Sequence, residues 1–157
     1  MFCNKFNHTV DDKGRLIVPM EYREELSGQN PEEARLFYIT TNLWDPSGHT
    51  EPCLCLWPEK NYMALREKLA GISGGDEKIR RIKRRFFSST QSSLLDKQGR
   101  VLIIPELKDY AGIVKNVMLV GADDHIEVWD YDAWSRYLEA DDEENSAWNE
   151  TLASLGF

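Results

Sequence analysis

The chain has 157 residues, of which 41% are hydrophobic and 11% aromatic, so it can bury a substantial core and is not a disordered polypeptide. No apolar run approaches the roughly 20 residues of a membrane-spanning helix, and the N-terminus lacks the pattern of a secretory signal. We therefore expect a cytoplasmic protein with no membrane partner. The formal net charge of −8 disfavours a general polyanion binder, because such proteins usually carry an excess of basic residues.

Charge is unevenly distributed along the chain. Residues 78–85 contain six basic and no acidic side chains, whereas residues 139–157 contain six acidic and no basic ones. The net value therefore hides one strongly basic segment. The acidic segment is typical of a solvated, partly disordered tail, although it could also aid solubility or discourage indiscriminate DNA binding.

A short motif occurs twice. Residues 11–19 read DDKGRLIVP and residues 96–105 read DKQGRVLIIP, with one extra apolar residue before the second proline. The match continues downstream to Trp57 and Trp129. From the motif arginine to that tryptophan is 42 residues in the first copy and 29 in the second, a difference of 13. We place the excess in a long surface loop over residues 42–52.

The first copy is predicted to contain strands and one short helix. Alternating apolar residues predict strands at residues 6–10, 16–18, 36–41 and 53–57. Pro19 ends the second strand and fits the first turn of a helix. On that helix Tyr22 and Leu26 lie four residues apart, and Gly28 can end it.

Two helices are predicted between the copies. Tyr62, Leu65 and Leu69 share one face of a helix over residues 59–70, and the glycine-rich residues 71–75 end it. A second helix begins near Asp76, an acceptable N-cap. Its apolar stripe consists of Ile79, Ile82 and Phe86. The rest of its surface carries Arg80, Arg81, Lys83, Arg84 and Arg85, which form either a solvated face or a surface for phosphate contact or subunit docking.

The second copy repeats the order of elements. Leu107, Tyr110 and Ala111 predict a helix after Pro105, and Gly112 can end it. Strands are predicted at residues 117–121 and 126–129, joined by a short hairpin connection near residues 122–125. Four short strands and one helix bury little apolar surface alone, so we expect the copies to pair into one barrel-like core, as an internal dimer.

The predicted fold class is α+β, with four segments along the chain. These are a first repeat over residues 1–58, a helical connector over 59–88, a second repeat over 89–132, and a C-terminal helix with an acidic tail over 133–157.

The repeated Asp-x-x-Gly-Arg pattern suits a tight hairpin. An Asp carboxylate accepts hydrogen bonds from turn amides, and Gly takes the positive φ that other residues resist. The predicted turn-shaping residues are Asp11, Gly14, Asp96 and Gly99.

The motif arginines need a separate explanation, because the turn itself does not require them. Arg15 and Arg100 could each pair with the Asp four residues earlier, which as an exposed pair contributes only about 0–1 kcal/mol. They could instead bind phosphates, or guanine edges in a major groove, with bidentate geometry. The residues alone leave both roles open.

The sequence offers little support for an enzyme or a metal site. Cys3, Cys53 and Cys55 are expected to be reduced thiols, the last two buried on one face of a strand. The histidines are scattered, and the chain contains no recognisable phosphate loop or nucleophile motif. We expect no catalytic activity, no cofactor and no metal.

Taken together, these motifs resemble the MraZ family. The resemblance rests on the opening Met1-Phe2, both Asp-x-x-Gly-Arg motifs with their prolines, and the segments 110–112, 120–121 and 126–129. It spans Met1 to about Trp134. MraZ proteins are tandem relatives of the AbrB and SpoVT transition-state regulators. Asn4 stands where the family usually has Gly.

The resemblance implies two swapped-hairpin repeats paired into a pseudo-twofold β-barrel with short peripheral helices. It also implies a ring-shaped homo-oligomer that is associated with the nucleoid and binds repeated promoter sites in double-stranded DNA, ahead of cell-division and cell-wall genes. The residues that it assigns to DNA binding are Arg15, Arg100, Lys13, Lys97 and Lys5. A ring would couple weak contacts through effective concentration, so net acidity would matter less than the placement of charge.

A second function stays open from the residues alone. A ring-forming or antitoxin-like scaffold that binds other proteins, without specific DNA recognition, could use the same fold. A large exposed apolar patch would favour the scaffold, and basic groups near both turns would favour DNA binding.

Overall fold

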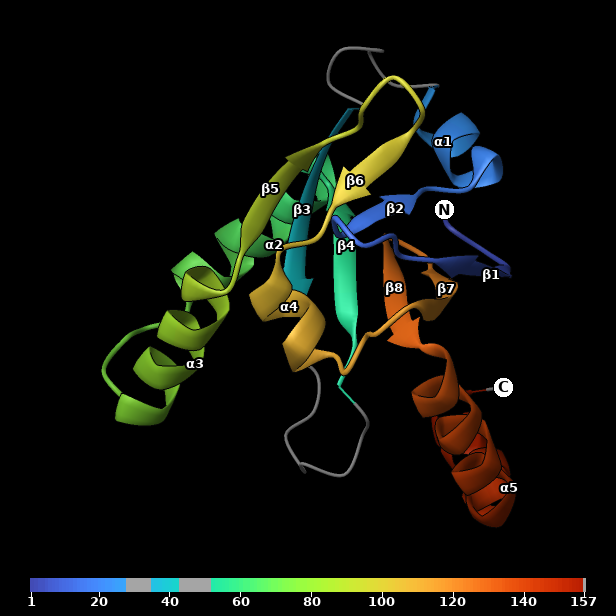
Figure 1. The fold of residues 1–157 in the computed structure, drawn as a ribbon. Helices are drawn as coiled ribbons and strands as arrows, with labels where there is room; N and C mark the ends of the chain where they lie inside the picture. The colour runs from blue at the N-terminus through green and yellow to red at the C-terminus, as the bar shows by residue number, and fades with distance from the viewer. Residues whose placement is uncertain (28–34, 43–51, 157) are drawn as a thin grey trace.

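The computed structural model describes residues 1–27, 35–42 and 52–156, with no side chains described at position 27 or at 140–149 (Figure 1). The expected helix end at Gly28 and most of the long loop over residues 42–52, including His49, lie outside the described residues.

Helices and strands follow the predicted order, and the predicted strand bounds agree to about one residue. The first half contains β1 (Lys5–Thr9), β2 (Arg15–Ile17), α1 (Met20–Ser27), β3 (Leu36–Thr41) and β4 (Leu54–Pro58). The connector contains α2 (Glu59–Gly71) and α3 (Glu77–Ser88). The second half contains β5 (Gln91–Leu94), β6 (Arg100–Leu102), α4 (Pro105–Tyr110), β7 (Asn116–Ala122) and β8 (His125–Asp130), followed by α5 (Tyr131–Ser154).

The strands form two antiparallel sheets. Six strands make one sheet in the order β1-β7-β8-β4-β3-β5, and β2 pairs with β6 in a separate ribbon. The order of the larger sheet is unchanged when the halves are exchanged, because β1, β3 and β4 correspond to β5, β7 and β8. Each half also places its first strand on the other half, since β1 pairs with β7 and β5 pairs with β3.

The described strands do not close into the expected barrel. The strands β2 and β6 have only three residues each, because the chain turns away from each of them to begin α1 or α4. Among the described residues, the one further bridge of β2 besides its pairing with β6 is an isolated bridge between Leu16 and Val10. The ribbon therefore packs against the larger sheet instead of completing its hydrogen bonding.

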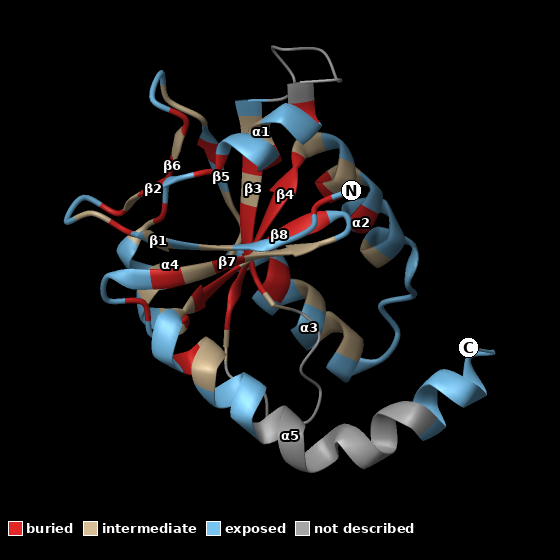
Figure 2. Cartoon of the chain, turned by 90° about the vertical axis from the view of Figure 1, so that its right-hand side faces the viewer, coloured by how far each residue is buried: buried red, intermediate tan, exposed pale blue. Residues whose placement is uncertain are grey.

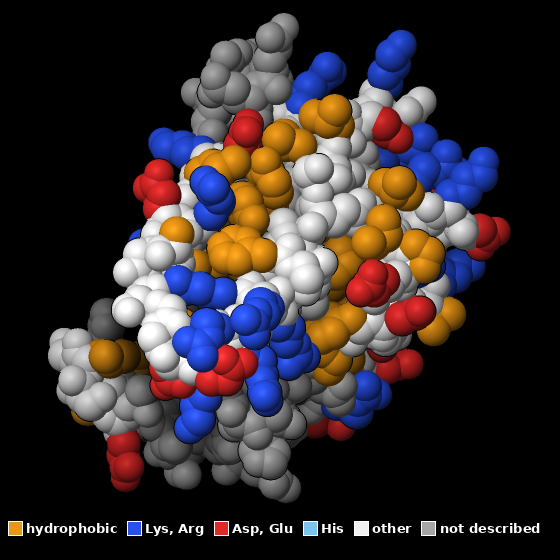
Figure 3. Space-filling view, turned by 90° about the vertical axis from the view of Figure 1, so that its left-hand side faces the viewer, with side chains coloured by type: hydrophobic (Ala, Val, Ile, Leu, Met, Phe, Trp, Pro, Cys, Tyr) orange, Lys and Arg blue, Asp and Glu red, His pale blue; other side chains and the backbone are white. Residues whose placement is uncertain are grey.

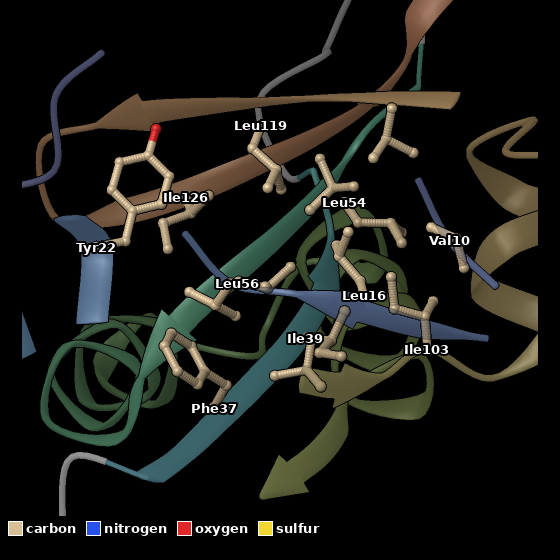
Figure 4. Close-up of a cluster of buried hydrophobic side chains, with 14 of the residues drawn as sticks. Val10, Leu16, Tyr22, Phe37, Ile39, Leu54, Leu56, Ile103, Leu119 and Ile126 are labelled. Carbon is tan, nitrogen blue, oxygen red and sulfur yellow. The ribbon is translucent and has the colours of Figure 1, made fainter. Parts of the chain in front are cut away.

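The larger sheet separates two layers. On one face, Leu16 and Ile103 from the ribbon side meet Leu54, Leu56 and Ile126 of the sheet in the main core (Figure 4). The opposite face carries α2 and α3, whose side chains pack against Cys55 and Trp57 of β4. Figure 2 shows the buried residues gathered along the strands between these layers. The ribbon and the basic helix α3 therefore lie on opposite faces of the sheet.

The first helix of each half begins at the same distance from its motif. Tyr22 and Leu26 are buried in α1, and Leu107 and Ala111 are buried in and after α4. Tyr22 corresponds to Leu107, and Leu26 corresponds to Ala111. Each corresponding pair is separated by 85 positions (107 − 22 and 111 − 26), the same separation as between the motif aspartates (96 − 11). The second copy therefore contains no inserted residue up to this point, and only its proline has moved one position along the chain.

Asn4, immediately before β1, has a φ of 70°. Its carbonyl oxygen accepts hydrogen bonds from the Tyr22 hydroxyl at 2.8 Å and from the Gly121 N–H at 2.9 Å. Asn is among the residues that tolerate the left-handed conformation, so it can occupy this position.

Two expectations for the peripheral helices are wrong. In α3 Phe86 is fully buried, but Ile82 is 53% exposed, so the predicted apolar stripe packs at only part of its length. The C-terminal segment is helical through Ser154 and is not a partly disordered tail. The Asp130 carboxylate caps this helix by accepting from the N–H groups of Asp132 and Ala133, both at 3.2 Å.

Candidate nucleic-acid interface

The first motif turn is closed by its aspartate and its glycine. One carboxylate oxygen of Asp11 accepts from the N–H groups of Lys13 and Arg15, both at 2.9 Å, and the other accepts from Arg15 Nε at 2.5 Å. Gly14 takes a φ of 81° and donates its N–H to the Asp11 carbonyl oxygen at 2.9 Å. The carboxylate therefore holds the turn backbone and the arginine together.

The second turn has the same hydrogen bonds. One carboxylate oxygen of Asp96 accepts from the N–H groups of Gln98 and Arg100 at 2.9 Å, and the other accepts from Arg100 Nε at 2.6 Å. Gly99 takes a φ of 77° and donates its N–H to the Asp96 carbonyl oxygen at 3.0 Å. The repeat is thus preserved at the level of individual atoms.

Both turn aspartates are stabilised as carboxylates. The Arg15 backbone N–H is the main cause that lowers the pKa of Asp11 below its ordinary value, with its guanidinium and the Lys13 N–H contributing further. Desolvation works in the opposite direction on Asp96, but the Arg100 N–H, its guanidinium and the Gln98 N–H outweigh it, so the pKa of Asp96 is also lowered. Both aspartates are therefore fully ionised at neutral pH.

Each motif arginine is oriented by its own aspartate. Because only Nε is donated to the carboxylate, the terminal nitrogens remain available. Among the described residues, those of Arg15 have no hydrogen-bond partner, and those of Arg100 make one long contact, 3.4 Å, with Gln98. The ion pair thus fixes the direction of the guanidinium and leaves its outer edge for a ligand.

The ribbon displays both arginines on one face. Arg15 pairs with Leu102 and Ile17 pairs with Arg100, so the arginines are diagonal neighbours whose Cα atoms are roughly 7–8 Å apart. The middle residue of each strand, Leu16 or Val101, is fully buried. Because side chains alternate along a strand, the arginines on either side point outward. Figure 2 shows both hairpin tips as exposed loops that project to the same side of the molecule.

The structure separates the predicted lysines into two groups. Lys13 and Lys97 are exposed within the turns. Lys5 is also exposed, but it begins β1, whereas the turn follows the end of that strand. Five residues of extended chain span roughly 17 Å, so the structure does not bring Lys5 to the first turn.

The basic side chains of α3 fall into two classes. Arg80 donates to the carbonyl oxygens of Gly74 and Gly75, and Lys83 donates to that of Ile72, so both fasten the connection between α2 and α3. Arg81 and Arg85 are exposed and have no partner among the described residues. Figure 3 shows the α3 side of the molecule, where Lys and Arg side chains alternate with exposed apolar ones.

The three cysteines are free thiols, Cys3 exposed and Cys53 and Cys55 buried. No cluster of three or more His, Cys, Asp or Glu side chains in the described part of the chain could hold a metal ion. The described helices include none that is long and apolar enough to cross a membrane.

The fold and the interface define a class of protein: a duplicated α+β protein whose two halves present matched arginine hairpins on one ribbon. A family model described as "MraZ protein, putative antitoxin-like" matches residues 1–39 and 86–155, which include both hairpins and all of β1, β2, β5 and β6. The chain belongs to the MraZ family.

Curated relatives agree with this assignment. Proteins named transcriptional regulator MraZ from Thermomicrobium roseum and Clostridium acetobutylicum are 32% and 35% identical to the chain, over 99% of both partners in each case. The protein of that name from Finegoldia magna is 35% identical over 87% of this chain and 86% of its own length. A solution structure from Pyrococcus horikoshii is 20% identical over 82% of this chain and 88% of that one, with a TM-score of 0.35. The family is one of transcriptional regulators, which confirms the prediction that the protein is not an enzyme.

Sequence reasoning missed one basic residue beside the turns. Arg23 of α1 lies against the second turn, although it belongs to the first half of the chain. No local pattern in the sequence indicates this contact, because the constant spacing of 85 pairs Arg23 with Lys108, which is not among the atoms nearest to the first turn's glycine.

Proposed function

We propose that the protein is a DNA-binding transcription regulator that recognises repeated promoter sites through its paired Asp-x-x-Gly-Arg hairpins. The observation that carries the proposal is the matched pair of arginines on one face of the ribbon, each held by its aspartate with its outer edge unoccupied. A guanidinium edge of this kind suits bidentate recognition of a phosphate or of guanine.

The size of the ribbon supports this use. A two-stranded antiparallel ribbon is one of the elements that the major groove of B-DNA admits. The outer face of the β2–β6 ribbon carries Arg15 and Arg100 together with Ile17 and Leu102, which are 44% and 46% exposed. These apolar side chains could contact thymine methyl groups beside the positions read by the arginines.

The finer assignments of the proposal rest on the family resemblance together with the strand order. We propose a tandem AbrB/SpoVT-like swapped-hairpin fold, which is supported by the pairing of β1 with β7 and of β5 with β3. We also propose a nucleoid-associated, ring-shaped homo-oligomer that acts ahead of cell-division and cell-wall genes. A ring offsets the net charge of −8 by presenting many copies of the small arginine surface to one DNA molecule.

A binding titration tests this function. The full-length protein is titrated against the DNA upstream of its own gene and against a scrambled fragment of equal length and composition. We expect tighter binding to the upstream fragment, and we expect Arg15→Ala and Arg100→Ala each to weaken that binding by about 1–3 kcal/mol, or roughly 5- to 150-fold. Equal affinity for both fragments, or full affinity in both variants, would contradict the proposal.

A protein-binding scaffold is the second candidate, and one observation favours it. Ile17 and Leu102 are exposed at diagonal positions on the same face of the ribbon, as an apolar contact with a protein partner would require. The double variant Ile17→Thr/Leu102→Thr distinguishes the two functions. If the ribbon binds a protein, this variant loses the protein partner, and the parent shows no preference for upstream DNA. If the ribbon binds DNA, Arg15→Ala and Arg100→Ala reduce DNA affinity more than the double variant does.

A further inference from the structure

Arg23 is held against the second hairpin by a connected set of contacts. Its Nε donates a hydrogen bond to the Val18 carbonyl oxygen at 3.0 Å. The Val18 N–H in turn donates to the Gly99 carbonyl oxygen at 2.9 Å. The guanidinium is therefore attached, through the residue that follows β2, to the turn of the other half.

The guanidinium also lies directly on the turn backbone. A Cβ placed on Gly99 would be 2.7 Å from Nη1 of Arg23 and 2.8 Å from its Cζ, closer than real side-chain contacts. The positive φ of Gly99 favours glycine, and the missing side chain also lets the Arg23 guanidinium approach the turn closely. Since Arg100 follows Gly99 in the chain, two guanidiniums lie beside one turn.

Arg23 uses its Nε as the motif arginines do. In all three, Nε is donated to an acceptor in the protein, a carboxylate for Arg15 and Arg100 and a carbonyl for Arg23. No carboxylate within the described ranges forms an ion pair with Arg23. Its positive charge and terminal nitrogens are therefore not neutralised by the described chain, and an oriented guanidinium of this kind matches a phosphate.

The surroundings of the first turn's glycine are different. The three nearest atoms to a Cβ on Gly14 belong to Leu102 and Ile103, and the nearest is the backbone oxygen of Ile103. Lys108, the counterpart of Arg23, is not among them. Among the described residues, the atoms nearest to Gly99 therefore belong to a cation from the opposite half of the chain, whereas those nearest to Gly14 do not.

We propose that Arg23 is a phosphate-contacting residue of the second hairpin, supplied by the first half of the chain. This inference rests on the proposed function and deepens it. Because phosphate contacts position a protein without reading sequence, Arg23 should contribute to affinity for all DNA, whereas Arg100 should contribute to the preference for the upstream site.

The test measures the salt dependence of binding for the full-length protein on both upstream and scrambled DNA. For Arg23→Gln we expect the slope of log Kd against log salt to fall by about 0.9 for each engaged protomer, with an unchanged ratio of affinities for the two fragments. Arg66→Gln is the matched control, because Arg66 is exposed on α2, on the opposite face of the sheet, and should leave the slope unchanged. Thermal unfolding of each variant checks that the fold is retained.

Arg23→Lys separates charge from shape. It keeps the cation but lacks Nε, so we expect it to retain most of the slope that Arg23→Gln loses. A parental slope in folded Arg23→Gln, or an equal loss in both Arg23 variants, would overturn the proposal. A parent that binds DNA without preferring the upstream fragment contradicts the proposed function, yet the slopes still test Arg23.

Discussion

The two hairpins share their hydrogen bonds but differ in their surroundings. The first turn reads Asp-Asp-Lys-Gly-Arg, with a formal charge of −2 + 2 = 0, and the second reads Asp-Lys-Gln-Gly-Arg, with −1 + 2 = +1. The second turn also carries Arg23 against its glycine, whereas the first glycine faces a backbone carbonyl. The side chain of Arg15 is 36% exposed and that of Arg100 is 25% exposed.

This difference separates what the turn requires from what is free to vary. Aspartate, glycine and arginine recur because each makes a contact that closes the turn or orients the guanidinium. The intervening positions have no such contact from their side chains to their own turn beyond the long one from Gln98, so they can change charge without changing the fold. The two turns share the same hydrogen bonds and differ in charge and in their neighbours.

The largest expected effect distinguishes the two glycines by stability. Both have positive φ, which costs a non-glycine residue about 1–2 kcal/mol. In Gly14→Ala the new Cβ meets a backbone oxygen that cannot move freely, so we expect a total loss of about 2–5 kcal/mol. In Gly99→Ala it meets the flexible end of Arg23, so the loss should stay near 1–2 kcal/mol. Denaturant unfolding measures both, and an equal loss would contradict the comparison.

A charge exchange between the turns should change DNA binding with little effect on stability. Asp12 in the first turn corresponds to Lys97 in the second, and both are exposed. We expect Asp12→Lys to steepen the salt dependence of binding and Lys97→Asp to flatten it, by roughly one in log-log slope when a contact is gained or lost. Each should change the free energy of unfolding by under about 0.5 kcal/mol. Slopes that do not respond would place the turns away from phosphate.

The turns should respond equally to acid. The pKa of each turn aspartate is lowered on folding, so each carboxylate stabilises the folded state above the ordinary value of 3.8. That stability is lost as the pH falls through the lower, folded pKa. Melting temperatures between about pH 5 and about pH 2 should therefore fall less steeply for Asp11→Asn and Asp96→Asn than for the parent. Unequal slopes for the two variants would show that the turns differ electrostatically as well.

The smallest effect is expected from the basic helix. Because α3 lies on the opposite face of the sheet from the ribbon, we expect the double variant Arg81→Gln/Arg85→Gln to keep the parental salt slope. Arg80 and Lys83 are left intact, because they fasten the helix to its connection. A slope that falls by about one per lost contact would show that α3 reaches phosphate.

Much of the fold could be predicted from local patterns. Alternation at β3 and β4, helical spacing at α2 and the aspartate before α3 each specify an element through nearby residues alone. The repeat also identified both turns. The assignment of Asp11 and Asp96 to hydrogen bonds with turn amides needed only the known behaviour of Asp-x-x-Gly sequences.

The remaining features depend on contacts between distant segments. Nothing local indicates that α3 buries Phe86 and leaves Ile82 exposed, because the neighbouring layer decides which part of the stripe is covered. A barrel-like core was expected because each half alone buries little apolar surface, but strand lengths and sheet edges, which decide whether a barrel closes, are not visible in periodicity. Arg23 was missed because its neighbour, Gly99, is 76 positions away in sequence (99 − 23 = 76) and belongs to the other copy.

The joining of two non-identical halves in one chain has a consequence for how DNA could be oriented. Two identical subunits related by a twofold axis favour a palindrome, since each presents the same surface. Here the two modules are covalently joined, and each can change without altering the other. An unequal pair of hairpins distinguishes the two directions along a duplex, so a bound protomer would have polarity, as a row of direct repeats does.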